Sequence, residues 1–201
     1  MTELLIENLT YPPFDQLNFQ LSHPGLYGVI GSNGAGKSTF FSVINGEIDF
    51  KQGTIQVGKI AYVPTLEIFD PNLTAKDYIN LLHTQEKKRF KQLVSNMGGV
   101  DFFHKKIGHY SLGMKELFSF LFSLSVESDL LILDELIDGL DEKKRQLAYK
   151  ELEKEASDKI ILFTSHNLSE VFQHCPVVYL LERAGIKEVE NLEEAKGCLG
   201  L

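Results

Sequence analysis

The sequence predicts an α/β fold in which helices cover a mainly parallel sheet, and two patterns along its 201 residues support this. First, five short apolar runs are continuous rather than alternating, as is typical of parallel strands buried on both faces. Second, a long stretch with helical spacing separates the second run from the third. The apolar runs span residues 26–30, 60–63, 130–133, 160–163 and 177–181.

Three further segments predict an antiparallel edge beside this core. Residues 4–8 and 17–21 alternate apolar with polar side chains, and 54–58 is a candidate to pair with them. The helical stretch, from about 74 to 126, begins at Thr74, which is a suitable N-cap. We therefore expect a single domain over residues 1–201. Its core would span about 1–64 and 127–201, with an inserted helical subdomain at about 65–126.

Composition excludes several classes of function. The formal net charge of -8 argues against nucleic acid as the main partner, because contacts to phosphate need a positive surface. The basic run at 87–91 is interpreted as a solvated helix face. Two isolated cysteines, Cys175 and Cys198, suit neither a disulfide framework nor a zinc site, and they indicate a reducing cytosol.

The sequence also lacks the marks of export or membrane insertion. Residues 1–10 mix acidic with apolar side chains, so they do not resemble a signal peptide. No apolar stretch approaches the roughly 20 residues that span a bilayer. If the protein works at a membrane, we expect another polypeptide to supply the spanning segments.

A phosphate-binding loop directly follows the strand predicted at 26–30. It matches the pattern Gly, four residues, Gly-Lys-Ser, and a helical pattern at 40–44 completes the strand, loop and helix that the motif requires. Glycines let successive N–H groups converge on a phosphate at a helix N-terminus. Lys37 is expected to reach the β- and γ-phosphates, and the Ser38 hydroxyl to bind Mg²⁺. The predicted nucleotide-binding residues are Gly31, Ser32, Asn33, Gly34, Ala35, Gly36, Lys37, Ser38 and Thr39.

Polar residues follow two other predicted strands at the edge where open α/β sheets bind ligands. Asp134 and Glu135 come directly after the run 130–133. Asp134 suits a Mg²⁺ ligand, and Glu135 is placed to accept a proton from an attacking water. Alone, such a pair would also be compatible with a helix cap. His166, after the run 160–163, is a candidate contact for the γ-phosphate.

The surroundings of these motifs resemble the ATP-binding subunits of ABC transporters. Tyr110-Ser111-Leu112-Gly113-Met114 is similar to the family's signature motif, in the form common among bacterial drug, bacteriocin and lantibiotic exporters. Gly139-Leu140-Asp141 looks like the D-loop, Thr164-Ser165-His166 like the H-loop, and residues 61–74 like the segment around the Q-loop. The resemblance covers nearly the whole chain in the family's order.

This resemblance implies a P-loop NTPase core and a subunit that hydrolyses ATP with Mg²⁺ to power a separate transmembrane permease, as in an exporter. It implies a homodimer or heterodimer of ATPase domains that closes on ATP, with Ser111 and Gly113 facing the γ-phosphate held by the other protomer. Glu135 would be the general base, His166 would orient phosphate and water, and Asp141 would lie at the dimer seam. The location implied is cytoplasmic, on the inner face of the cell membrane.

One position of the family pattern has two candidates, and two other positions are altered. An aromatic ring normally stacks on adenine near the N-terminus, and Tyr11 is the first candidate and Phe14 the second, with an exposed loop aromatic as the alternative reading of either. Thr65 stands where the family has a glutamine, so we expect metal contact from its shorter side chain, through a water, and slower hydrolysis or altered coupling. Leu112 replaces a glycine of the commoner signature, with little expected effect.

Three other functions compete with a transporter subunit. A soluble ABC-type ATPase switch usually carries tandem nucleotide domains or a long coiled coil, and neither is present in this sequence. A nucleotide-binding regulator without turnover is suggested by Thr65, but Glu135 and His166 argue against it. A GTPase is disfavoured because the sequence has no Asn-Lys-x-Asp guanine motif.

Overall fold

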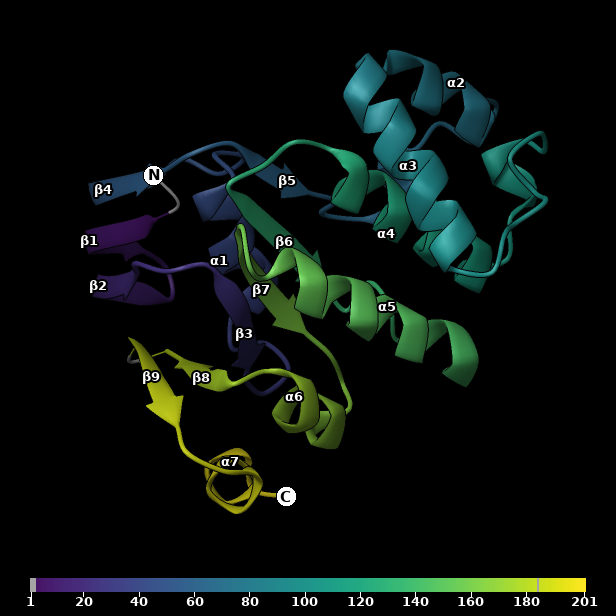
Figure 1. Cartoon of the computed structure of the whole chain (residues 1–201). Coiled ribbons are helices and arrows are strands. Elements are labelled where there is room, and N and C mark those ends of the chain that lie inside the picture. Colours follow the sequence, from purple (N-terminus) through teal and green to yellow (C-terminus); the bar gives the residue numbers. More distant parts are fainter. Residues whose placement is uncertain (1–2, 184) are drawn as a thin grey trace.

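The computed structural model describes residues 3–183 and 185–201, so residues 1 and 2 of the N-terminal segment considered above lie outside it. Its larger sheet has six strands in the order β5-β6-β7-β3-β8-β9 (Figure 1). Neighbouring strands are parallel except for the last pair, β8 and β9. The mainly parallel sheet is therefore confirmed. The strands are β5 (Ile60–Tyr62), β6 (Leu130–Asp134), β7 (Ile160–Thr164), β3 (Gly25–Ile30), β8 (Val177–Glu182) and β9 (Gly185–Val189).

The central strands are apolar throughout because both of their faces are covered. On β6, Leu131 and Leu133 point into one hydrophobic core, while Leu130 and Ile132 point into another. The alternation of side chains along a strand distributes a continuous apolar run between two layers. The sheet thus separates two cores, and its edges remain free to carry polar residues.

A smaller antiparallel sheet packs on one side through the helix that follows the phosphate loop. Its order is β2-β1-β4, with β1 (Leu4–Tyr11), β2 (Phe14–Leu21) and β4 (Gln52–Val57), as the alternating pattern predicted. Helix α1 (Lys37–Ile44) places Phe40 and Phe41, both fully buried, in the core shared by the two sheets. This packing holds α1 between the two sheets, and the phosphate loop leads directly into its first turn.

The predicted helical stretch forms a lobe at the upper right of Figure 1. Thr74 caps its first α-helix as predicted: the Asp77 amide donates to Thr74 Oγ1 at 3.3 Å, and the Thr74 amide donates to Asp77 Oδ2 at 2.8 Å. The last helix of the lobe is buried on nearly every side and joins the lobe to the sheet. The lobe comprises η1 (Leu66–Ile68), α2 (Ala75–Leu81), α3 (Thr84–Asn96), η2 (Ile107–His109) and α4 (Leu112–Ser125).

Three more helices complete the fold. Helices α5 (Glu142–Glu155) and α6 (Leu168–His174) contribute to the core on the side of the sheet away from α1, and α7 (Leu192–Leu199) follows β9 (Figure 1). Strand β9 was not predicted, because its exposed Lys187 and Glu188 interrupt any apolar run. Within 3–183 and 185–201, no helix is both long enough and apolar enough to traverse a bilayer.

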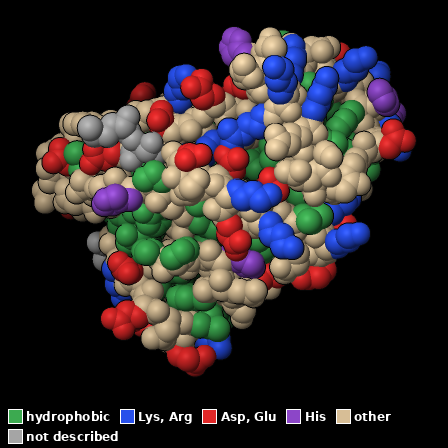
Figure 2. All heavy atoms as spheres, viewed as in Figure 1, with side chains coloured by type: hydrophobic (Ala, Val, Ile, Leu, Met, Phe, Trp, Pro, Cys, Tyr) green, Lys and Arg blue, Asp and Glu red, His purple; other side chains and the backbone are tan. Residues whose placement is uncertain are grey.

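The charges on the face seen in Figure 2 are mixed. Blue Lys and Arg side chains concentrate where Figure 1 places α3 and α5, and red acidic side chains lie among them. The basic run at 87–91 lies on α3, where Arg89 pairs with Glu155 of α5. Lys88 and Lys91 of the same run are exposed, which agrees with a solvated helix face.

Candidate active site

The phosphate loop leaves the first turn of α1 without a side-chain cap. The N-cap residue is Gly36, with φ 102°, and no side chain accepts a hydrogen bond from the turn that follows. In contrast, Thr74, Ser111 and Asp141 each cap their own helix with a side-chain oxygen. The uncapped N–H groups of α1 suit an anion, because the helix dipole adds to their partial positive charge.

The loop also has room for a phosphate. Gly34 has φ 79°, and a Cβ added to it would meet no atom within 4 Å. The Lys37 ammonium donates to the carbonyl of Gly31 at 3.0 Å, and so it lies across the mouth of the loop. Two adjoining hollows, of about 260 and 300 Å³, are lined by every predicted loop residue except Ala35, which is buried.

A hydroxyl and a carboxylate meet beside the loop in a way that fits Mg²⁺. Ser38 Oγ lies 2.6 Å from Asp134 Oδ2, and Thr164 Oγ1 donates to Asp134 Oδ1 at 2.8 Å. Mg²⁺ is commonly held by one or two protein oxygens together with water and substrate phosphates. In the part of the chain that the structure describes, no cluster of three or more His, Cys, Asp or Glu forms an all-protein metal site. Ser38 and Asp134 therefore suit a metal that arrives with the nucleotide.

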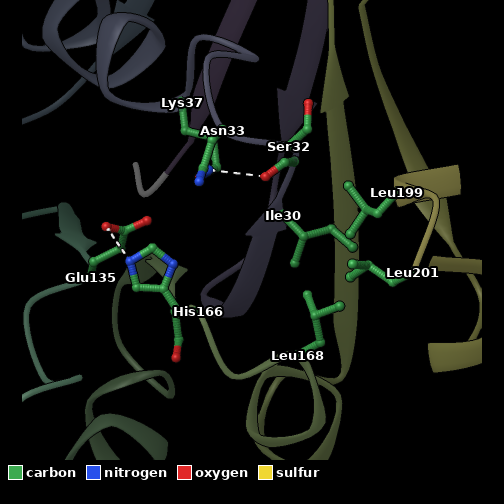
Figure 3. Close-up of a pocket in the computed structure, with 11 residues that line it drawn as sticks. Ile30, Ser32, Asn33, Lys37, Glu135, His166, Leu168, Leu199 and Leu201 are labelled. Atoms are coloured by element: carbon green, nitrogen blue, oxygen red, sulfur yellow. Dashed lines mark hydrogen bonds and ion pairs between the residues drawn. The ribbon is translucent and has the colours of Figure 1, made fainter. Parts of the chain in front are cut away.

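Glu135 is held in an unusual backbone conformation at the end of β6. Its φ of 55° lies in the left-handed region, which is uncommon for a residue with a side chain. The Glu135 amide donates to Thr164 Oγ1 at 2.9 Å, which fixes it against the neighbouring strand. Figure 3 shows its carboxylate meeting the His166 ring, with Glu135 Oε2 and His166 Nε2 3.0 Å apart. Both side chains line the hollow that contains Lys37.

Ser111 and Gly113, also predicted to bind nucleotide, lie away from this cluster. The Met114 amide donates to Ser111 Oγ at 3.3 Å, so Ser111 caps α4. A Cβ added to Gly113 would come within 3.1 Å of the Gly139 carbonyl oxygen. Neither residue lines the two hollows that contain Lys37. Their role across a dimer interface stays a prediction.

The remaining predicted residues differ in their placement. Phe14 is 2% exposed and packs edge-on against Phe40, so its faces are not free to stack on a base. Tyr11 is partly exposed at the end of β1 and stays the candidate. Thr65 lines neither hollow, and its Oγ1 accepts a hydrogen bond from the Glu67 amide at 3.2 Å. Contact between Thr65 and the metal stays a prediction.

Sequence reasoning missed Asp138. Its Oδ2 accepts a hydrogen bond from the His166 amide at 2.8 Å, and both residues line a hollow of about 310 Å³ with Arg145. The local sequence, Ile-Asp-Gly, is typical of a turn and gives no sign of this contact. The contact joins loops 28 residues apart.

Comparison with known proteins decides the family. The family model described as "ABC transporter" matches residues 14–138, which is more than half of the chain and includes the phosphate loop, the Ser111 segment and Glu135. The chain belongs to the ABC transporter ATP-binding family. Members of this family bind ATP with Mg²⁺ and couple its hydrolysis to transport. The predicted ATPase class and its cofactors are therefore confirmed at the level of the family.

Several curated ABC proteins resemble this chain over most of its length. The teichoic acids export ATP-binding protein TagH of Staphylococcus haemolyticus is 28% identical, with 94% of this chain and 75% of that protein covered. The ATP-binding protein BexA of Haemophilus influenzae is 29% identical, with 89% and 85% covered. A probable metal transport system ATP-binding protein of Thermotoga maritima is also 29% identical, with 95% and 88% covered.

Solved structures confirm the fold. A structure titled "Structure of ATP binding subunit of ABC transporter" superposes with a TM-score of 0.83 at 22% identity, covering 98% of this chain and 93% of that one. A putative metal-chelate type ABC transporter in an inward-facing conformation gives 0.81 at 23% identity, covering 100% and 90%. The ABC ATPase fold inferred from the motifs is thus confirmed.

Proposed function

We propose that this chain is the ATP-hydrolysing subunit of an exporter and powers a separate transmembrane permease. The observation that carries the catalytic part is the grouping of Ser38, Asp134, Glu135 and His166 at the uncapped N-terminus of α1. An anion site, two metal-binding oxygens and a carboxylate–imidazole pair together fit hydrolysis of a nucleoside triphosphate. The export direction is supported by the printed function of the TagH relative.

Each group has a separate task in this proposal. The amides of residues 32–39 and the Lys37 ammonium bind the β- and γ-phosphates. Ser38 and Asp134 would hold Mg²⁺, which would neutralise charge on the phosphates. Glu135 accepts a proton from the water that attacks the γ-phosphorus, and ADP leaves with the other two phosphates. The His166 Nε2–H lies on Glu135 Oε2 and is shared with the γ-phosphate when the nucleotide is bound, so one donor orients both groups. Tyr11 stacks on the adenine ring.

The remaining parts of the active site come from a second ATPase domain. The helical lobe at about 65–126 is a subdomain inserted in the core. The second ATPase domain places its Ser111 and Gly113 at the γ-phosphate. Ser111 and Leu112 are both exposed, as a surface that meets another protomer requires. The pair works on the inner face of the cell membrane, against the permease.

The role of Glu135 is tested with the Glu135→Gln variant. Removing the base while keeping the side-chain volume is expected to lower kcat at least about 100-fold and to leave the Kd for Mg-ATP within about threefold. Steady-state phosphate release and calorimetry measure the two quantities. Glu188→Gln, on exposed β9, is the matched control and keeps the parental kcat. Hydrolysis by Glu135→Gln at the parental rate would show that another group is the base.

The permease is tested separately by purifying the tagged chain from detergent-solubilised membranes of its native host. A polytopic membrane protein in stoichiometric amount is the expected companion. Recovery of the chain from the soluble fraction alone would favour a soluble ATPase switch over a transporter subunit.

A further inference from the structure

Asp138 connects two loops at the carboxyl edge of the sheet. It follows β6, and His166 follows β7, whose residues pair in parallel up to Asp134 and Thr164. The His166 amide donates to Asp138 Oδ2 at 2.8 Å, while Asp138 Oδ1 is buried and has no hydrogen-bond partner among residues 3–183 and 185–201. A buried carboxylate oxygen without a partner is costly, so the single bond to His166 has to offset that cost.

The segment that carries Asp138 is held from its other end by Arg145. The guanidinium of Arg145 donates to the Leu140 carbonyl at 3.0 Å and to Glu170 Oε1 at 3.0 Å. Glu170 is nearly buried on α6, the helix that begins just after His166, and its Oε2 accepts from the Tyr149 hydroxyl at 2.8 Å. The guanidinium also donates to the Glu142 carboxylate, and its planar shape holds the acceptors that it bridges at a fixed separation. Residues 138–141 are therefore tied once to the His166 loop and once, through Arg145, to the helix that follows it.

The same segment touches the helix that Ser111 caps. A Cβ added to Gly139 would come within 2.5 Å of Glu116 Oε2, so the Glu116 carboxyl of α4 lies directly over Gly139. Burial raises the pKa of Glu116, and the negative charge of Asp138 acts in the same direction. Residues 138–141 thus lie between α4 and the His166 loop and contact both.

The His166 ring has little packing of its own. Its side chain is 66% exposed, and its recorded partner is Glu135 Oε2 at 3.0 Å. Because little packing holds the ring, the place of Nε2 depends on the Glu135 contact and on the backbone position from which the side chain starts. A displacement of about 1 Å in a reacting group can cost about 100-fold in rate.

We propose that Asp138 is a positioning residue, which holds the backbone of His166 so that its imidazole stays on Glu135 and the γ-phosphate, with Arg145 fixing the same segment from the other end. This inference rests on the proposed function, since it assigns a task within ATP hydrolysis. It predicts that Asp138 affects turnover without contacting the nucleotide, and that its hydrogen-bond acceptor matters more than its charge.

The experiment compares Asp138→Ala with Asp138→Asn in the full chain. The alanine variant removes the acceptor and is expected to lower kcat about 10- to 100-fold with KM within about twofold, because ground-state binding does not use Asp138. The asparagine variant keeps an acceptor oxygen and is expected to stay within about threefold of the parental kcat. Asp129→Ala is the matched control: Asp129 Oδ2 accepts from the Lys59 amide at 2.9 Å, at the opposite edge of the sheet.

Amide hydrogen exchange at His166 supplies a readout that does not depend on turnover. Exchange is expected to be at least about tenfold faster in Asp138→Ala than in the parent, and near parental in Asp138→Asn. Unchanged exchange in the alanine variant would overturn the proposal, as would faster exchange with parental kcat. Equal losses of kcat in both variants would show that the negative charge of Asp138, and not its hydrogen-bond acceptor, is what matters. If the parent itself hydrolysed no ATP, the proposed function would fail, whereas exchange would still report whether Asp138 holds His166.

Discussion

Polar groups at the two edges of the large sheet differ in their hydrogen bonding. At the amino edge, backbone groups pair with one another. The Gly25 amide donates to the Lys159 carbonyl at 3.1 Å, the Ile160 amide to the Asp129 carbonyl at 3.0 Å, and the Asp129 amide to the Lys59 carbonyl at 2.8 Å. The Lys59 amide in turn donates a hydrogen bond to the Asp129 carboxylate. Closed sets of this kind stabilise a fold and leave nothing for a ligand.

At the carboxyl edge, groups remain available. Helix α1 begins without a side-chain cap, Gly34 opens onto free space, and the Lys37 ammonium has a backbone carbonyl as its recorded partner. The Ser38 hydroxyl and the Asp134 carboxylate share one bond where a metal would separate them. We therefore expect mutations at the amino edge to change the free energy of unfolding, and mutations at the carboxyl edge to change the affinity for nucleotide.

The largest expected difference comes from the two lysines at these edges. Lys37→Met removes a charge-assisted contact to phosphate and is expected to raise the Kd for Mg-ATP about 10- to 100-fold. Lys159→Met, at the amino edge, is expected to leave that Kd within about twofold. Calorimetric titration of each variant measures the pair. Equal losses of affinity in the two variants would contradict the claim that only the carboxyl edge binds nucleotide.

A smaller effect is expected from Asp129, where the readout is stability. Asp129→Ala leaves the Lys59 amide without its acceptor and should lower the free energy of unfolding by about 1–2 kcal/mol. Urea denaturation with ATP-free protein measures this, and Asp129→Asn, which keeps an acceptor, should recover most of the loss. If affinity for ATP fell instead while stability held, the amino edge would be part of the site.

The smallest expected effect is on pH dependence. Burial of Lys159, together with the nearby positive charge of Arg89, lowers the pKa of its ammonium from 10.5 to about 8. Between these two values the unfolded chain holds a proton that the folded chain has released, so the free energy of unfolding should rise with pH across that window. The slope for one proton cannot exceed about 1.4 kcal/mol per pH unit.

Comparing the parent with Lys159→Met at several pH values between 7.5 and 9.5 isolates this contribution, because other groups titrate in both proteins. The difference in stability should move in favour of the parent as pH rises. A constant difference would mean that Lys159 keeps its ordinary pKa in the folded state.

Much of the fold was predictable because burial leaves a pattern in the sequence. The run 130–133 is apolar at every position since both faces of β6 are covered, and that requirement is visible in one sequence. Strand β9 escaped prediction because its Lys187 and Glu188 face solvent at the end of the sheet. Helix α1 starts at Lys37, earlier than the apolar pattern at 40–44 suggested, because its first turn serves the loop rather than the core.

The site was most readily predictable where a motif fixes both spacing and residue type. The loop at 31–39 and the pair Asp134 and Glu135 meet that condition, and the structure brings them together. Asp138 does not, because its partner is a backbone amide, which any residue at 166 would offer. The choice between Tyr11 and Phe14 depended on which ring the turn buries, and alternation along β1 and β2 does not determine that.

The left-handed backbone of Glu135 has a consequence for how the protein can change. At φ 55° a glycine would relieve strain of roughly 1 kcal/mol, so Glu135→Gly should fold at least as well as the parent while losing the proposed base. Selection for stability alone would therefore favour loss of this carboxylate. In screens for thermostable variants of this chain, residue 135 should be sequenced, because a stabilising change there would remove the proposed base.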